Sequence, residues 1–284
     1  MSAPLALRSI LFVPGTRADR FQKAFDSGAD AVILDLEDAV EAGRKEDARR
    51  QVAEWVAGTP RARAGRFVRI NAPGSPWIDG DLGWMRTQGG SFDAVVIPKA
   101  ERATDVERVA TAIGSRRVIP LLETARGILH AAVIATADAD IPAILFGAED
   151  LTAELAIPRT LDGEELLFAR SQVALAAATI GADAIDAVFV DLAAPEALRR
   201  DAMRARALGF RGKMAIHPDQ VPVINRVFSP TAEEIAAARR IVDADASARA
   251  GGEGVFRLDD RMVDAPVVRR AHRVLAIADA IAGT

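Results

Sequence analysis

Short apolar runs, each followed by a stretch with helical spacing, recur along most of the chain. The runs are continuous instead of alternating, which is typical of strands buried on both faces of a parallel sheet. The eight runs cover residues 9–14, 31–36, 66–71, 94–99, 117–122, 143–147, 187–192 and 213–218. Strand and helix units in this number predict a closed (β/α)8 TIM barrel. An open doubly wound sheet is the alternative, and it is less favoured because no GxGxxG motif follows the first strand.

The pattern changes after the eighth run. Thr231 and Glu234 have the spacing of a capping box at the start of a helix, and a second helix is expected from about Pro266 to the end. The AGGEG cluster between them predicts a flexible turn. We therefore expect a barrel domain at 1–228 and a C-terminal helical extension at 229–284. The extension is too short for a core of its own, so it must pack on its barrel or on a neighbouring subunit.

Composition narrows the function. The net charge is −4 with both signs dispersed, and no basic block with interleaved aromatics occurs, so nucleic acid is not an expected partner. No apolar run approaches the roughly 18 residues that a membrane span needs. The chain has no Cys, which excludes disulfides and zinc-thiolate sites, and no secretory signal pattern opens it. We expect a cytoplasmic protein that binds no membrane.

Candidate chemistry lies at the carboxyl ends of the predicted strands, which open onto one face of a parallel barrel. Glu123 follows the fifth strand and Asp150 follows the sixth, so two hard oxygen donors are expected to meet there. Such donors favour Mg²⁺, or Mn²⁺, over a thiolate metal. Either acid alone would also suit a helix cap. Together on neighbouring strands they indicate metal ligands.

Basic residues at the same strand ends have more than one interpretation. Arg69 lies inside the third strand, where a buried guanidinium needs a carboxylate partner. It therefore suits either a substrate contact or a structural pair with Glu37 or Asp35. Lys99 and Lys213 are the residues that a Schiff-base aldolase would use, although a long charged side chain in such a position is more often a member of a salt bridge.

The motifs together resemble one family. The matching stretches, in order, are RSILFVPGTRADRFQKA, DAVILDLEDAV, VRINAPG, DAVVIPKAE, PLLETARGI, LFGAEDLTAEL, GFRGKMAIHPDQV, FSPTAEEI and MVDAP. This ordered set resembles the citrate lyase β-subunit-like proteins of the HpcH/HpaI aldolase and malyl-CoA lyase group. It extends from about Arg8 to Asp264.

The resemblance implies a Mg²⁺-binding (β/α)8 enzyme that assembles as a homotrimer or hexamer and acts on short acyl-CoA thioesters. By this resemblance Glu123 and Asp150 are the metal ligands, and Arg69 holds the substrate at the reacting centre. It also implies contacts to the substrate or CoA from residues near the mouth, namely Arg17, Lys213, Gly147, Ala148 and Glu149. Asp264 resembles an acid that some members insert into a neighbouring subunit's site.

The expected activity is a Mg²⁺-dependent carbon–carbon lyase acting on citryl-, malyl- or citramalyl-CoA, or the reverse condensation. Arg69 would stabilise the enolate, and Asp264 or Glu37 would shuttle the proton. Three alternatives remain open. The same site could end in thioester hydrolysis or a malate synthase-like reaction, Lys99 could form a Schiff base, or the chain could be a binding subunit of a larger lyase.

Overall fold

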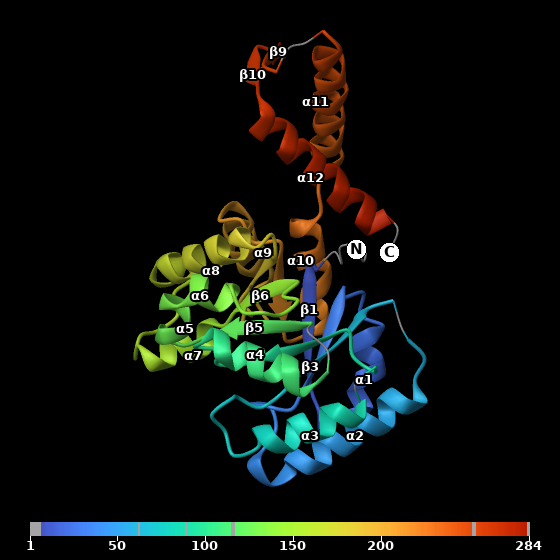
Figure 1. The fold of residues 1–284 in the computed structure, drawn as a ribbon, viewed down its shortest axis with the longest axis vertical. Coiled ribbons are helices and arrows are strands. Elements are labelled where there is room, and N and C mark those ends of the chain that lie inside the picture. Colours follow the sequence, from blue (N-terminus) through green and yellow to red (C-terminus); the bar gives the residue numbers. More distant parts are fainter. Residues whose placement is uncertain (1–6, 62, 89, 115–116, 252–253, 283–284) are drawn as a thin grey trace. The chain divides into compact units, whose positions relative to one another are not determined.

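The computed structural model describes residues 7–61, 63–88, 90–114, 117–251 and 254–282. They form two compact units, Leu7–Phe228 and residues 229–282. Figure 1 shows the fold of both. None of the helices formed by this part of the chain is long and apolar enough to cross a membrane.

The larger unit is a closed barrel of parallel strands in sequence order, with β1 paired to both β2 and β8. The strands are β1 Ser9–Pro14, β2 Ala31–Asp35, β3 Gly65–Arg69, β4 Ala94–Ile97, β5 Val118–Leu122, β6 Ala143–Phe146, β7 Asp183–Asp186 and β8 Gly212–Ala215. This architecture confirms the predicted (β/α)8 barrel.

Helices alternate with the strands and cover the outside of the barrel (Figure 1). They are α1 Ala18–Phe25, α2 Lys45–Gly58, α3 Ile78–Gln88, α4 Ala103–Ala112, α5 Ala125–Leu129, α6 Ala131–Ala135, α7 Ala148–Glu154, α8 Leu167–Thr179, α9 Pro195–Ala207 and α10 Val221–Phe228. Short 3₁₀ turns lie at Ala42–Arg44, Glu164–Leu166 and Pro218–Gln220.

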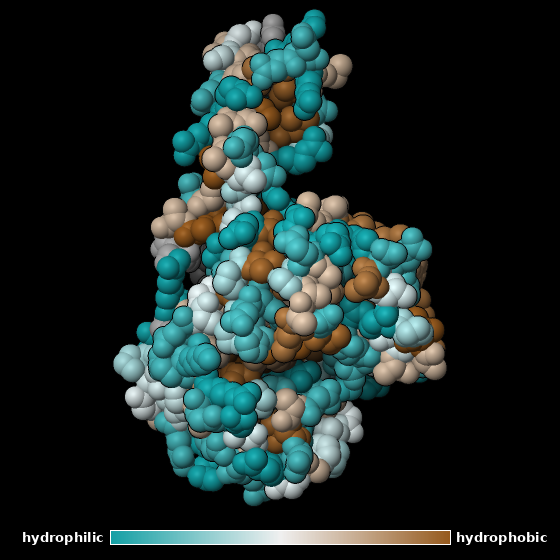
Figure 2. Space-filling model, turned by 180° about the vertical axis from the view of Figure 1, so that it is seen from behind, coloured by the Kyte–Doolittle hydropathy of each residue, from teal (hydrophilic) through white to brown (hydrophobic). Residues whose placement is uncertain are grey.

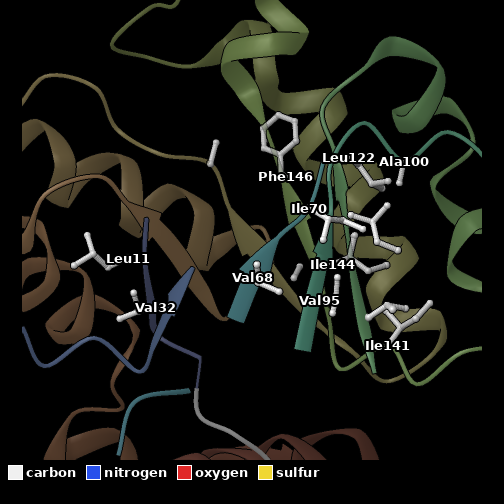
Figure 3. Close-up of a cluster of buried hydrophobic side chains, with 14 of the residues drawn as sticks. Leu11, Val32, Val68, Ile70, Val95, Ala100, Leu122, Ile141, Ile144 and Phe146 are labelled. Carbon is white, nitrogen blue, oxygen red and sulfur yellow. The ribbon is translucent and has the colours of Figure 1, made fainter. Parts of the chain in front are cut away.

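Apolar side chains alternate between two layers because successive residues of a strand point to opposite faces. One cluster fills the barrel interior and takes a side chain from every strand: Ile10, Ile33, Phe67, Val96, Leu121, Leu145, Ile185 and Met214. The other lies between strands and helices and includes Leu11, Val32, Val68 and Ile144 (Figure 3). Both layers are buried, which explains why the strands appear as continuous apolar runs.

The seventh strand is not where the apolar run predicted it. The run at 187–192 follows the strand, and β7 itself is Asp183–Asp186, paired with both β6 and β8. Asp186 is fully buried there, and its charge is neutralised by Arg170 and Lys213. Local hydrophobicity could not indicate this burial, because it depends on those ion pairs.

The smaller unit contains α11 Ala232–Ala250, a β-hairpin of β9 Phe256–Leu258 and β10 Arg261–Val263, and α12 Ala265–Ala282. The capping box is confirmed: the Glu234 amide donates to Thr231 Oγ1 (3.2 Å), and the Thr231 amide donates to Glu234 Oε2 (2.8 Å). Residues 252–253 of the AGGEG stretch lie outside the described residues. The hairpin that follows them was not predicted, because its two strands have three residues each.

Candidate active site

Four residues at the carboxyl ends of the strands, each polar or small, point to the same side as the apolar side chains that fill the barrel interior. Each stands two positions after a residue of the interior cluster, and so on the same side of its strand. They are Asp35 after Ile33, Arg69 after Phe67, Glu123 after Leu121 and Gly147 after Leu145. The alternation that builds the core therefore also directs these residues to the mouth.

Arg69 and Asp35 form the buried base of the site. They stand opposite each other in the register of β2 and β3. Arg69 Nε and Nη2 donate to the two oxygens of Asp35, each at 2.7 Å, and the guanidinium lies 5.0 Å from the centre of the Phe12 ring. Burial is the largest single effect and lowers the pKa of Arg69, but the charges of Asp35, Glu37 and Glu123 and the hydrogen bonds to Asp35 together outweigh it, so the pKa is raised. Arg69 is therefore a permanent cation with a fixed orientation.

The loop after β2 brings Glu37 to the other side of this guanidinium. Its Oε2 lies 2.9 Å from Arg69 Nη1. The Glu37 amide donates to Asp35 Oδ1 (2.9 Å), and the buried Lys45 Nζ donates to the carbonyl of Glu37 (2.8 Å). Glu37 is only 5% exposed. Burial raises its pKa, against the lowering effect of Arg69 and Lys99.

Lys99 connects the acids of three barrel segments. Its Nζ donates to Glu37 Oε1 and, at 3.2 Å, to Asp38 Oδ2, and it lies 3.4 Å from Asp150 Oδ1. Its backbone amide donates to Glu123 Oε1 at 2.9 Å. The residue has a positive φ of 50°. The side chain thus lies among carboxylates from the β2 loop and α7, while its backbone holds the acid that follows β5.

The two acids predicted as metal ligands both contact Lys99, Glu123 through the backbone amide and Asp150 through the ammonium. Glu123 is 3% exposed, whereas the Asp150 side chain, in the first turn of α7, is about one third exposed at 36%. Burial raises the pKa of Glu123 to about 8; Arg69 opposes this shift, and Asp150 adds to it. Glu123 and Asp150 therefore interact electrostatically, and negative charge in this pocket is only partly compensated.

Gly147 makes room for Glu123. A Cβ at position 147 would lie 2.7 Å from Glu123 Oε2, closer than real Cβ contacts allow. The glycine also caps α7, so the helix carrying Asp150 begins directly beside the Glu123 carboxylate.

The charges of this cluster do not balance. It contains five carboxylates and three cationic side chains, which leaves two negative charges when all are ionised: Asp35, Glu37, Asp38, Glu123 and Asp150 against Lys45, Arg69 and Lys99. The donors are hard oxygens, so the residues present fit a divalent cation. Within the described ranges no group of three or more His, Cys, Asp and Glu is arranged to hold a metal. A metal bound by Glu123 and Asp150 would thus keep several waters, as Mg²⁺ usually does.

The other residues predicted to contact substrate or CoA differ in their exposure and in their partners. Arg17 precedes α1 and forms an exposed pair with Asp19 (2.7 Å). Ala148, at the start of α7, is buried, and the Glu149 side chain pairs with Arg159. Contacts of these residues to CoA remain predictions.

Lys213 does not face the mouth, and the expectation that it contacts CoA is corrected. Its side chain is fully buried, with Nζ 2.6 Å from both Asp186 Oδ2 and Asp201 Oδ2. Arg170 donates to the same two acids. Met214 points into the barrel, so its neighbour Lys213 must point outward to α8 and α9. Lys213 therefore belongs to a buried ion cluster between the barrel and its helices.

Asp264 belongs to the smaller unit, where it caps α12. The amide of Val267 donates to its Oδ1 at 3.2 Å. Its predicted role as a catalytic acid for a neighbouring subunit stays a prediction.

Sequence reasoning missed Lys45, placed Asp38 at the strand ends without a role in the site, and gave Asp35 only as one alternative partner of Arg69. Asp35 had a usable signal, since it stands two positions after an inward-facing isoleucine. Lys45 had none, because it lies in a helix and its ammonium reaches back to the carbonyls of Leu36 (2.9 Å) and Glu37.

The fold and site define an enzyme class: a (β/α)8 barrel with charged residues gathered at the carboxyl ends of its strands, where such barrels place their chemistry. The model of the HpcH/HpaI aldolase/citrate lyase family matches residues 8–218, and the chain belongs to this family.

Individual relatives agree with this assignment. The citrate lyase subunit beta-like protein of Deinococcus radiodurans is 40% identical, covering 97% of this chain and 99% of that protein. The (3S)-malyl-CoA thioesterase of Cereibacter sphaeroides is 35% identical over 97% of this chain and 95% of its own length. The crystal structure of CitE from Mycobacterium tuberculosis in complex with magnesium, acetoacetate and coenzyme A matches with a TM-score of 0.79 and 39% identity, covering 95% of this chain and 97% of that chain.

Proposed function

We propose that this protein is a Mg²⁺-dependent carbon–carbon lyase that cleaves a short 2-hydroxy-acid acyl-CoA thioester into acetyl-CoA, or a homologue, and an oxo acid. The observation that carries the proposal is the position of Glu123 within electrostatic range of both Arg69 and Asp150, in a cluster with more carboxylates than cationic side chains. The relative crystallised with magnesium, acetoacetate and coenzyme A supports the same metal and the same class of ligands.

In this proposal Glu123 and Asp150 hold the metal. When bound, the cation supplies a Lewis acid that polarises the hydroxyl and carboxylate of the substrate. Asp35 fixes the orientation of the Arg69 guanidinium, which in this proposal stabilises the negative charge that develops on the thioester oxygen.

The reaction needs one proton carrier. The hydroxyl loses its proton, the carbon–carbon bond breaks, and its electron pair forms the thioester enolate, which is then protonated on carbon. Glu37 suits this exchange, because burial raises its pKa toward the range of an effective acid and base. Asp264 of a neighbouring subunit is the second candidate.

A coupled assay with citryl-, malyl- and citramalyl-CoA tests the proposal. We expect turnover of at least one thioester with Mg²⁺, loss of turnover with EDTA, and equal amounts of oxo acid and acyl-CoA. Turnover that survives EDTA would contradict the metal mechanism. No turnover of any thioester by the purified chain would favour the binding-subunit alternative.

Hydrolysis is a second candidate function, favoured by the similarity to the (3S)-malyl-CoA thioesterase. The products distinguish the two: a thioesterase releases free CoA and the intact hydroxy acid, whereas a lyase releases an oxo acid.

The geometry argues against the Schiff-base alternative. Burial is the largest single effect and lowers the pKa of Lys99, but the hydrogen bond to Glu37 and the charges of Glu37, Glu123 and Asp150 together outweigh it, so the pKa is raised. A Schiff-base lysine must be neutral to attack a carbonyl. Borohydride trapping with substrate should therefore give no adduct at Lys99.

We also propose a homotrimer or hexamer, with contacts on the second half of the barrel. Among the described residues of the larger unit, the exposed large apolar side chains lie between Leu129 and Ile216, and Phe168 and Leu175 of α8 are both 64% exposed. Several apolar patches are visible on the face of this unit that Figure 2 shows. Exposed apolar patches are typical of an interface. Light scattering after chromatography should show an oligomer that Phe168→Glu dissociates and Gln22→Glu leaves intact; a monomeric parent protein would contradict the proposal.

A further inference from the structure

Lys99 makes more contacts to the acid cluster than any role in the proposed chemistry requires. Its ammonium is bonded to Glu37 and Asp38 and lies 3.4 Å from Asp150, while its amide holds Glu123. Its side chain is 30% exposed, so the ammonium is at the edge of the pocket and not sealed in the core.

The backbone conformation of Lys99 would favour glycine, so the lysine side chain must have a use of its own at this position. Lys99 has a φ of 50°, a conformation that costs an ordinary residue on the order of 1 kcal/mol and glycine almost nothing. The hydrogen bond to Glu123 comes from the backbone amide, so glycine could make it equally well. The feature that only lysine supplies is the ammonium among the three other acids.

We propose that Lys99 is a positioning residue and an internal counter-cation: it fixes Glu37 beside Arg69, and it competes with Mg²⁺ for Asp150, thereby weakening metal binding. This inference rests on the proposed function, because it assumes that Asp150 is a metal ligand.

Two opposite effects follow from removing the ammonium. The pocket gains one uncompensated negative charge, so a divalent cation binds more tightly. A charge of +1 a few ångströms from a divalent ion costs roughly one to two kcal/mol even at the dielectric constant of water, which corresponds to about a tenfold change in affinity. Glu37 simultaneously loses a donor that holds its carboxylate, so proton transfer becomes less efficient. Metal affinity rises while kcat falls.

The test uses the full-length chain and calorimetric titration with MgCl₂ alone, without substrate. We expect Lys99→Met to bind Mg²⁺ about tenfold more tightly than the parent protein, with a lower kcat. Lys99→Arg keeps the charge and should restore the parent affinity. Lys23→Met, the same substitution at an exposed position of α1, should change neither quantity.

The outcomes separate this inference from the proposed function. If the parent protein binds no Mg²⁺, the proposed function fails. If the parent binds Mg²⁺ and folded Lys99→Met binds it with equal or weaker affinity, the counter-cation role is overturned and the proposed function stands. Urea unfolding of each variant shows whether the chain is folded during the titration.

Discussion

Gly147 and Glu123 share a space that holds only one side chain. A Cβ on residue 147 would lie 2.4 Å from the Cβ of Glu123, although the two residues follow different strands. Because residue 147 has no side chain, the Glu123 side chain can occupy this space.

Gly147→Ala should displace the Glu123 carboxylate. We expect Mg²⁺ affinity and kcat both to fall at least tenfold, with a loss of about 1–3 kcal/mol in unfolding free energy from overpacking. Calorimetric titration and urea unfolding measure these quantities.

Gly83→Ala is the matched control. Gly83 lies in α3, and a Cβ there would meet no heavy atom within 4 Å. This variant should gain about 0.5–1 kcal/mol of stability, as alanine does in a helix, with unchanged Mg²⁺ affinity. Equal behaviour of the two variants would show that Gly147 has no special relation to the site.

Arg69→Lys should lower kcat by about 100-fold to 1000-fold, the usual effect of removing a donor that stabilises developing negative charge. Lysine keeps the charge but not the two-pronged geometry that Asp35 orients. Mg²⁺ affinity should change little. Arg8→Lys breaks a comparable pair with Asp30 (2.7 Å) at the opposite end of the barrel, and it should reduce stability without reducing kcat per folded molecule. Full activity of Arg69→Lys would exclude it from the chemistry.

Asp264 can be tested without destroying its helix cap. Asparagine caps helices about as well as aspartate, whereas alanine costs roughly 1 kcal/mol. If Asp264 is a catalytic acid, Asp264→Asn loses turnover while retaining both stability and Mg²⁺ affinity. Normal turnover of this variant, with reduced stability only in Asp264→Ala, would assign the residue to capping alone.

The buried cluster around Lys213 predicts a specific loss of stability in acid. Burial tends to raise the pKa of Asp201, but Lys213 and Arg170 outweigh this and lower it to about 2 from 3.8. The ionised carboxylate therefore stabilises the fold by about 2 kcal/mol above pH ~4, and this contribution disappears as the pH falls toward 2. Urea unfolding of the parent and Asp201→Asn should show a stability difference that narrows from pH 6 to pH 3. A constant difference would contradict the shifted pKa.

Much of the fold follows from the sequence because strand burial leaves a direct signal. Seven of the eight predicted strands overlap the observed ones, since their apolar runs are buried on both faces. The seventh was misplaced because Asp186 is a buried acid, stabilised by Arg170, a residue distant in the sequence. Ion pairs of this kind form only after the chain has folded, so local hydrophobicity does not encode them.

The site was predictable to a similar degree. Position after a strand identified Glu123, Asp150 and Arg69 as residues of the barrel mouth. Position at a strand end did not suffice for Lys213, because this criterion ignores the face of the strand on which a side chain lies. Counting alternate residues from the apolar core would have sent Lys213 outward. The left-handed backbone of Lys99 has no signal in the sequence, since lysine rarely adopts it.

Titrating the full-length protein with MgCl₂ measures whether Glu123 and Asp150 hold the metal. We expect one Mg²⁺ bound per chain, and no detectable binding by folded Glu123→Gln or Asp150→Asn at the same concentrations. Undiminished Mg²⁺ binding by both variants would show that these acids do not hold the metal, and the proposed mechanism would be wrong.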